Sequence, residues 1–304
     1  MPQHGFHDVH RHSLAHMVTT SLRLPTHLSW LTRSTTFVLT ITVALACFLP
    51  CDGSAATLTV AASQDTTIFQ EAPGNSNGVG AVFITGRAGG TGNPAPLRRA
   101  LLAFDFAGLP QGTTVESATL TLTLTQSAGT SLVPFGFYRV LSSWGEAGSI
   151  AASPGQGAPA ATGDATWTAR SFGAIPTSAW VNSGGDYAAS ASATTLVSGV
   201  TATIPTPYTW LSTPQFVSDV QHWIDDPASN FGWILIGGEG SPSTARQFAS
   251  SENLTSSYQP VLTLISTPVP EPSTWLLFMA SMGSVLAFAR STIQKPNRLA
   301  SAYP

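Results

Sequence analysis

Within residues 115–125, apolar and hydroxyl-bearing side chains alternate from position 118 onward. The even-numbered positions carry Ala118, Leu120, Leu122 and Leu124, whereas the odd-numbered positions from 119 carry threonine. Successive side chains of a β-strand point to opposite faces, so this period of two predicts a strand with its leucines in a core and its threonines toward solvent.

Other segments share this strand-like composition and are separated by turn residues. We expect further strands at residues 57–62, 66–69, 81–85, 99–106, 136–141, 232–236, 246–249 and 261–265. The connections are too short or too rich in glycine and proline for crossover helices, so the pairing should be antiparallel. The fold class predicted is therefore all-β, an antiparallel β-sandwich.

One short helix is expected within this fold. Thr213 and Pro214 supply an N-cap and a proline at the first helical position, and Phe216, Val220 and Trp223 recur at helical spacing. The preceding region, 145–212, is rich in alanine, serine, glycine and threonine, and we expect short strands and ordered loops there.

The N-terminal region has the order of a secretory signal peptide. Arg33 precedes an apolar run at 37–49, and small residues follow at 53–56. Cleavage is expected near Ala55 or Ala56, lipidation of Cys47 is an alternative, and the start is open between Met1 and Met17. Residues 1–56 are thus assigned to a leader and signal peptide, and residues 57–266 to the β-sandwich domain.

Residues 267–304 form a different kind of segment. Prolines make 267–272 an extended spacer, an apolar run covers 276–289, and Arg290 follows as a basic stop. We expect an apolar sorting helix here; a plain single-span anchor is the alternative, although the run is short for one.

Charge and cysteine content limit the function of the central segment. Residues 57–268 contain no cysteine and no lysine, and six arginines stand against twelve carboxylates. A domain with this acidic excess repels nucleic acid, and without disulfides it needs an ordinary hydrophobic core. We expect no nucleic-acid partner.

Residue patterns typical of an active site are weak in this segment, and we do not expect the protein to be an enzyme. His222 is the only histidine of this segment, no Gly-x-Ser-x-Gly elbow accompanies it, and a lone imidazole does not make a zinc site. Glycoside hydrolysis requires two converging carboxylates, and the candidates for such a pair are Glu146, Asp164, Asp186, Glu239 and Glu252.

No organic cofactor is implied, and a structural calcium ion stays open because several oxygen-bearing side chains stand in loops. Those candidates, with no ligand set assigned, are Asp65, Glu71, Asn75, Asn77, Asp225, Asp226 and Asn230. Turn formation and helix termination explain the same residues equally well.

Tryptophans are the candidates for sugar binding, since indole faces stack on sugar rings. Trp167, Trp180 and Trp210 are flanked by small polar residues and are assigned as carbohydrate-binding candidates; core packing is the competing interpretation.

The C-terminal segment resembles a PEP-CTERM sorting signal. The residues that carry the resemblance are the motif Pro270, Glu271 and Pro272, the apolar run and Arg290. This family implies export through the inner membrane of a Gram-negative, polysaccharide-producing bacterium, a transient stay in that membrane, and processing by an exosortase-type enzyme.

A set of short segments spread over the body of the chain carries a second resemblance: 65–68, 77–78, 98–105, 118–120, 143–146, 220–223, 230–232, 248–252 and 259–262. With these segments the body of the chain resembles the DNRLRE-type domain, which implies a jelly-roll-like β-sandwich related to carbohydrate-binding modules. No catalytic residues come with this resemblance.

Together these features predict a cell-surface or extracellular-matrix protein that binds or organises exopolysaccharide. A purely structural stalk or biofilm protein is the alternative, and an enzyme that degrades polysaccharide is the third hypothesis.

Overall fold

The computed structural model describes residues 55–89, 96–109, 112–174, 178–199, 204–267 and 281–283. The expected signal peptide before Ala55 and the sorting residues Pro270, Glu271, Pro272 and Arg290 lie outside these ranges. No helix among the described residues is long and apolar enough to cross a membrane.

Strands dominate the described chain. They are β1 (Ala56–Phe69), β2 (Asn75–Ser76), β3 (Val82–Arg87), β4 (Leu97–Phe104), β5 (Thr114–Ser127), β6 (Val133–Arg139), β7 (Ala158–Pro159), β8 (Ala169–Ser171), β9 (Ser178–Ala179), β10 (Ala193–Val197), β11 (Thr206–Trp210), β12 (Trp233–Gly237), β13 (Arg246–Ala249) and β14 (Val261–Thr267). The helical elements are α2 (Pro214–Asp225) and the 3₁₀ turns η1 (Pro154–Gln156), η2 (Pro227–Ser229) and η3 (Ser256–Tyr258).

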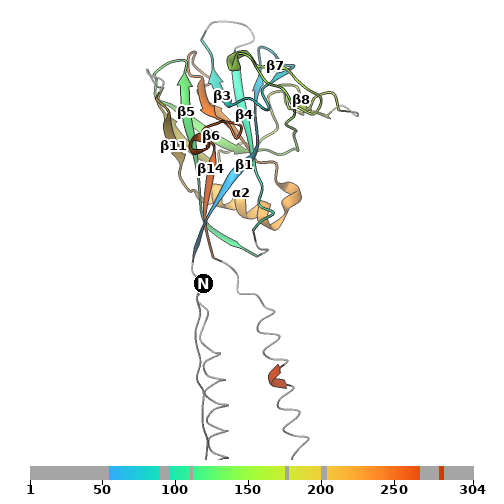
Figure 1. The fold of residues 1–304 in the computed structure, drawn as a ribbon, viewed down its shortest axis with the longest axis vertical. Coiled ribbons are helices and arrows are strands. Elements are labelled where there is room, and N and C mark those ends of the chain that lie inside the picture. Colours follow the sequence, from blue (N-terminus) through green and yellow to red (C-terminus); the bar gives the residue numbers. More distant parts are fainter. Residues whose placement is uncertain are drawn as a thin grey trace, which may run out of the picture. The chain divides into compact units, whose positions relative to one another are not determined.

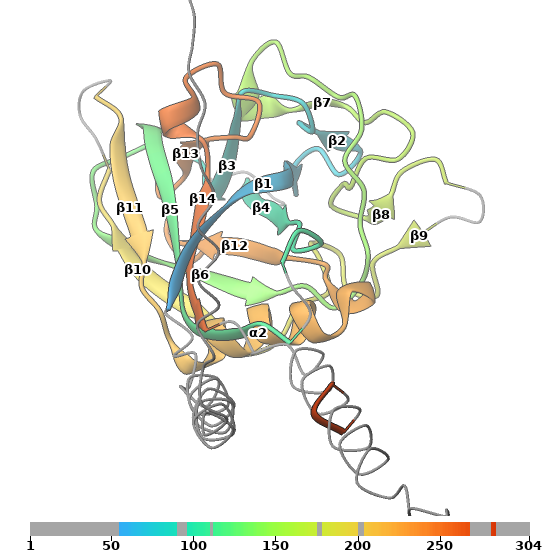
Figure 2. The same cartoon turned by 60° about the horizontal axis from the view of Figure 1, so that its bottom comes forward.

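The strand pairs are antiparallel, which confirms the predicted all-β class. Six strands, β1, β14, β5, β13, β3 and β4, pair in this order and form a closed ring, because β4 also pairs with β1. Strands β12, β6 and β10 continue from β4, and β11 pairs with β5 (Figures 1 and 2).

The closed ring depends on β1. The sequence predicts two strands there, whereas the structure has one strand whose register shifts between Ala62 and Gln64. Its first half pairs with β14 and its second half with β4, so β1 joins the two sides of the fold. A β-bulge bends and twists a strand, which explains how one strand serves both partners.

The main core is lined by the strands of this ring and also by β6, β10, β11, β12 and α2. Leu120, Leu122 and Leu124 of β5 are fully buried, as the alternation predicts, whereas Thr123, which was predicted to face solvent, is also buried. Helix α2 covers one end of the fold (Figure 2) and inserts Phe216 and Trp223 into the same core. The predicted N-cap is confirmed, since the side chain of Thr213 accepts a hydrogen bond from the backbone N–H of Phe216 at 3.0 Å.

A second core lies on the other face of β4. Leu101 points into it while its neighbour Leu102 points into the main core, and both are fully buried. The region between β6 and β10, which includes the short strands β7, β8 and β9, supplies most of the cover, including Trp167 and Trp180. The expectation of short strands and ordered loops in this region is therefore confirmed.

Candidate functional site

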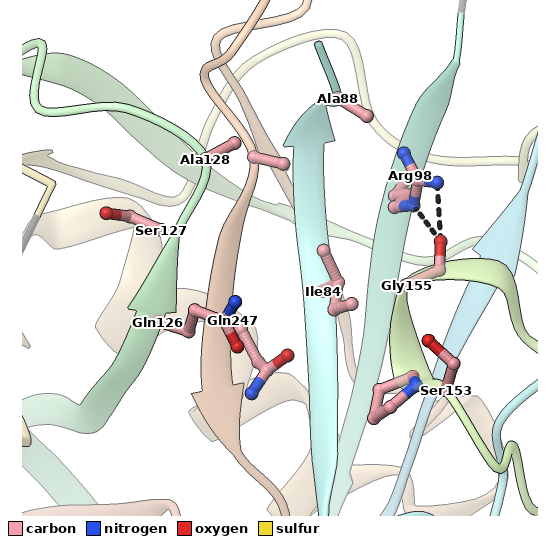
Figure 3. A pocket seen from close by; sticks show the side chains of 11 residues that line it. Ile84, Ala88, Arg98, Gln126, Ser127, Ala128, Ser153, Gly155 and Gln247 are labelled. Atoms are coloured by element: carbon pink, nitrogen blue, oxygen red, sulfur yellow. Dashed lines mark hydrogen bonds between the residues drawn. The ribbon is translucent and has the colours of Figure 1, made fainter. Parts of the chain in front are cut away.

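A shallow groove of about 290 Å³ crosses β5, β13, β3 and β4 on the face opposite the main core (Figure 3). Gln126 of β5 and Gln247 of β13 line it and are directly opposite each other in the strand register. The remaining lining residues are Ile84, Ala88, Arg98, Ser127, Ala128, Ser153, Pro154, Gly155 and Ala245.

Arg98 fixes one wall of the groove. Its Nε and Nη2 donate to the carbonyl oxygen of Gly155 at 3.0 Å and 2.5 Å (Figure 3), and it forms an ion pair with Glu71. Its guanidinium also lies 5.7 Å from the ring centre of Phe69. These contacts tie the η1 turn to β4, so the wall is held by a partly buried network.

The two glutamines of this groove offer groups that suit a neutral, hydroxyl-rich ligand. Side-chain amides offer both donors and acceptors, and Gln126 is exposed. Gln247 donates to Oγ1 of Thr125 at 3.3 Å, which orients its amide within the sheet. Sequence reasoning did not single out either glutamine, because their pairing depends on the long-range register of β5 and β13.

The three tryptophans assigned to sugar stacking are placed differently by the structure. Trp210 is fully buried in the main core, and its Nε1 donates to the carbonyl oxygen of Phe135 at 2.8 Å. Trp167 and Trp180 are 6% and 5% exposed in the second core. An indole face that is covered by protein cannot stack on a sugar, so these residues serve packing, and their polar sequence neighbours are a misleading signal.

Among the candidate carboxylates, the structure brings Glu146 and Glu252 together, and Asp65 joins them. Asp65 lies in β1, Glu146 follows β6, and Glu252 follows β13. One oxygen of each lies within 4.8 Å of the others. We call these three residues the acidic cluster.

Two members of the acidic cluster, Asp65 and Glu146, have raised pKa values. Burial raises the pKa of Asp65 to about 7, and the charge of Glu252 adds to this rise, while the hydrogen bond from Ser251 opposes it. Burial also raises the pKa of Glu146 to about 8, with further contributions from Asp65, Glu252 and Asp164. A buried carboxylate beside other carboxylates holds its proton more tightly.

Other candidate carboxylates have structural partners. Asp164 accepts hydrogen bonds from the backbone N–H groups of Ala147 and Ala161, at 2.6 Å and 2.7 Å. Glu239 pairs with Arg99, whose Nε lies 2.7 Å from its Oε1.

Asp186 holds a turn by accepting from the backbone N–H groups of Val181 and Asn182, at 2.9 Å and 2.8 Å. Asp164, Asp186 and Glu239 are therefore each bound to partners of their own, and none of them belongs to the acidic cluster.

Of the residues considered for calcium, only Asp65 belongs to the acidic cluster. The side chains of the others make bonds that serve the fold where a partner is recorded: Glu71 to Arg98, Asn75 to Gln156, Asn77 to Val82 and Ala151, Asp225 to Gln221, and Asn230 to Phe104 and Gly232. Asp226 is exposed after α2.

No family model and no curated protein matches this chain. The two family resemblances therefore rest on the motif residues themselves.

His222 is exposed on α2.

Proposed function

We propose that this chain is an exported cell-surface or extracellular-matrix protein that binds or organises exopolysaccharide without transforming it. The observation that supports a binding role is the groove over β5, β13, β3 and β4, with two opposed glutamines among its lining residues. A jelly-roll-like sandwich related to carbohydrate-binding modules is part of the same proposal, and the antiparallel all-β fold is compatible with it.

The groove makes this proposal testable by substitution. In affinity electrophoresis against the exopolysaccharide of the producing bacterium, the full-length protein should be retarded. Gln126→Ala should weaken the interaction about fivefold, because one net hydrogen bond is worth roughly 1 kcal/mol. Ser218→Ala is the control, since Ser218 is an exposed polar residue on α2, away from the lining of the groove.

The two negative outcomes have different meanings. Retardation that is unchanged in both Gln126→Ala and Gln247→Ala would place the glycan elsewhere on the protein. No retardation with any glycan would support the purely structural alternative, with which the burial of Trp167, Trp180 and Trp210 also agrees.

Export and sorting form the second half of the proposal, with an exosortase-type enzyme as the processing partner. Replacing Pro270, Glu271 and Pro272 with alanine should leave export intact and block C-terminal processing and surface release. Immunoblots of membrane and culture fractions would check this, and unchanged processing would reduce the segment to an anchor.

One observation favours a second candidate function, cleavage of polysaccharide. Glu146 and Glu252 converge, and the raised pKa of Glu146 would keep it protonated near neutral pH, as a general acid requires. A reducing-end assay on exopolysaccharide with wild type and Glu146→Gln would decide: product from wild type alone would support an enzyme, and no product from either would remove this candidate.

A further inference from the structure

The acidic cluster lacks the partners that a buried carboxylate needs. Asp65 is 1% exposed, and its Oδ1 has no hydrogen-bond partner. The buried Oε2 of Glu252 lacks a partner as well. An unpaired buried anion costs several kcal/mol, so such an arrangement is stable only with a proton or a cation between the oxygens.

Nothing cationic in the described chain faces this site. The charges that act on Glu146 are those of Asp65, Glu252 and Asp164, all of them carboxylates. The arginines that form ion pairs among the described residues do so elsewhere, with Glu71, Glu239 and Asp219.

The spacing of the oxygens fits a calcium ion. One oxygen of each carboxylate lies within 4.8 Å of the other two. Calcium binds oxygens at about 2.3–2.6 Å, so two ligands on opposite sides of one ion are about 5 Å apart. Three carboxylates offer at most six oxygens, and calcium takes about six to eight.

The surrounding structure holds these side chains in place. The backbone N–H of Ser251 donates to Oδ2 of Asp65 at 2.7 Å, and its hydroxyl donates to Oε1 of Glu252 at 2.8 Å. At Gly78 an added Cβ would lie 3.3 Å from Cγ of Glu146 and 2.6 Å from the carbonyl oxygen of Ala147, so this glycine lets the Glu146 segment pack closely.

We propose that Asp65, Glu146 and Glu252 bind one calcium ion, which joins β1 to the segments that follow β6 and β13. Asp65 is the fully buried ligand, and Glu146 and Glu252 are half-buried. The ion neutralises the cluster and thereby fastens three segments that are far apart in the sequence. This inference is independent of glycan binding in the groove.

Calcium is favoured over other divalent ions by the ligand set. Zinc prefers histidine and cysteine, whereas this cluster offers carboxylate oxygen alone. Magnesium requires a tighter octahedral shell and gives up its water reluctantly, so several carboxylates suit it less well. We expect magnesium to bind at least tenfold more weakly than calcium.

Calorimetric titration and thermal unfolding of the purified full-length protein, first stripped with EDTA, would test the proposal. Calcium should bind with a stoichiometry of one and raise the unfolding temperature by roughly 5–10 °C when it exceeds its dissociation constant a hundredfold. Asp65→Asn and Glu146→Gln should each weaken binding at least tenfold, and their circular dichroism spectra should show that they fold. Asp226→Asn, which changes an exposed aspartate after α2, should keep both heat and temperature shift.

Four results would overturn the assignment. These are no heat and no shift for the wild type, retained binding in both cluster variants, loss of binding in Asp226→Asn, and magnesium binding as tight as that of calcium. Glu146 is half-buried, so Glu146→Gln remains informative if Asp65→Asn fails to fold.

Discussion

Asp219 and Asp65 are both only 1% exposed, but opposite kinds of groups surround them. Asp219 on α2 accepts hydrogen bonds from Oγ of Ser192, Nε1 of Trp233 and Nε2 of Gln215, at 2.5, 3.0 and 2.9 Å. The Nε of Arg139 also lies 3.8 Å from its Oδ1. Asp65 receives one backbone hydrogen bond and otherwise faces two glutamates.

The contrast separates a carboxylate that the fold satisfies from one that it leaves incomplete. Around Asp219 the chain supplies donors and a cation, so the charge is compensated within the protein. Around Asp65 it supplies more negative charge, so compensation has to come from protons or from a bound cation. Burial of an acidic side chain alone therefore does not indicate a ligand; the identity of its neighbours does.

The largest expected effect comes from removing the satisfied charge. Asp219→Ala should lower the free energy of unfolding by about 3–5 kcal/mol, because it leaves buried donors and Arg139 without their acceptor. Urea denaturation would measure this loss, which should be the same with calcium and with EDTA. Asp225→Ala, an exposed change on the same helix, should stay within about 0.5 kcal/mol; a similar loss in both variants would refute the special role of Asp219.

Stability measurements over a pH series would examine Asp65 and the acidic cluster. The folded-state pKa of Asp65 is about 7 and that of Glu146 about 8, both above their ordinary values, so folding favours the protonated carboxyls. At a pH below the ordinary pKa values of Asp and Glu, these carboxyls are protonated in both the folded and the unfolded state, so the acidic cluster does not lower the stability. As the pH rises from about 4 to about 8, the free energy of unfolding should fall by up to about 1.4 kcal/mol per pH unit for each proton that only the folded state retains.

Urea denaturation of the EDTA-treated protein at several pH values would measure that slope. Asp65→Asn should flatten it, since the amide does not titrate, and calcium should flatten it in the wild type. An identical slope in wild type and Asp65→Asn would show that the acidic cluster is not its source.

The smallest effect concerns Thr213, the N-cap of α2, the helix that carries Asp219. Thr213 caps the helix and also donates from Oγ1 to the carbonyl oxygen of Ser192 at 2.5 Å. Thr213→Ala should lower the free energy of unfolding by about 1 kcal/mol. Thr213→Ser retains the hydroxyl and should recover most of this loss in the same urea titration; no difference between the two variants would refute the cap.

Local patterns in the sequence were sufficient for most of the secondary structure. The alternation around Leu120, Leu122 and Leu124 predicted β5 and its buried face, and the pair Thr213 and Pro214 predicted the start of α2. These predictions succeed because side-chain direction and helix capping depend on residues a few positions apart.

The candidate sites were harder to predict. The tryptophans were assigned by their polar sequence neighbours, but their burial depends on which segments fold over β4 and β11. Glu146 and Glu252 were among the candidate carboxylates, although their convergence with Asp65 could not be predicted, because three distant segments form the acidic cluster.

The sequence by itself determined an antiparallel all-β domain with one capped helix, and it determined that the core is held without disulfides, since these properties follow from local periodicity and composition. Only the tertiary structure decided that the ring of strands closes through β1 and that Gln126 lies opposite Gln247. It also decided that three acidic side chains meet where donors are scarce. The physical reason is that strand register and ring closure depend on long-range pairing, which local patterns do not specify.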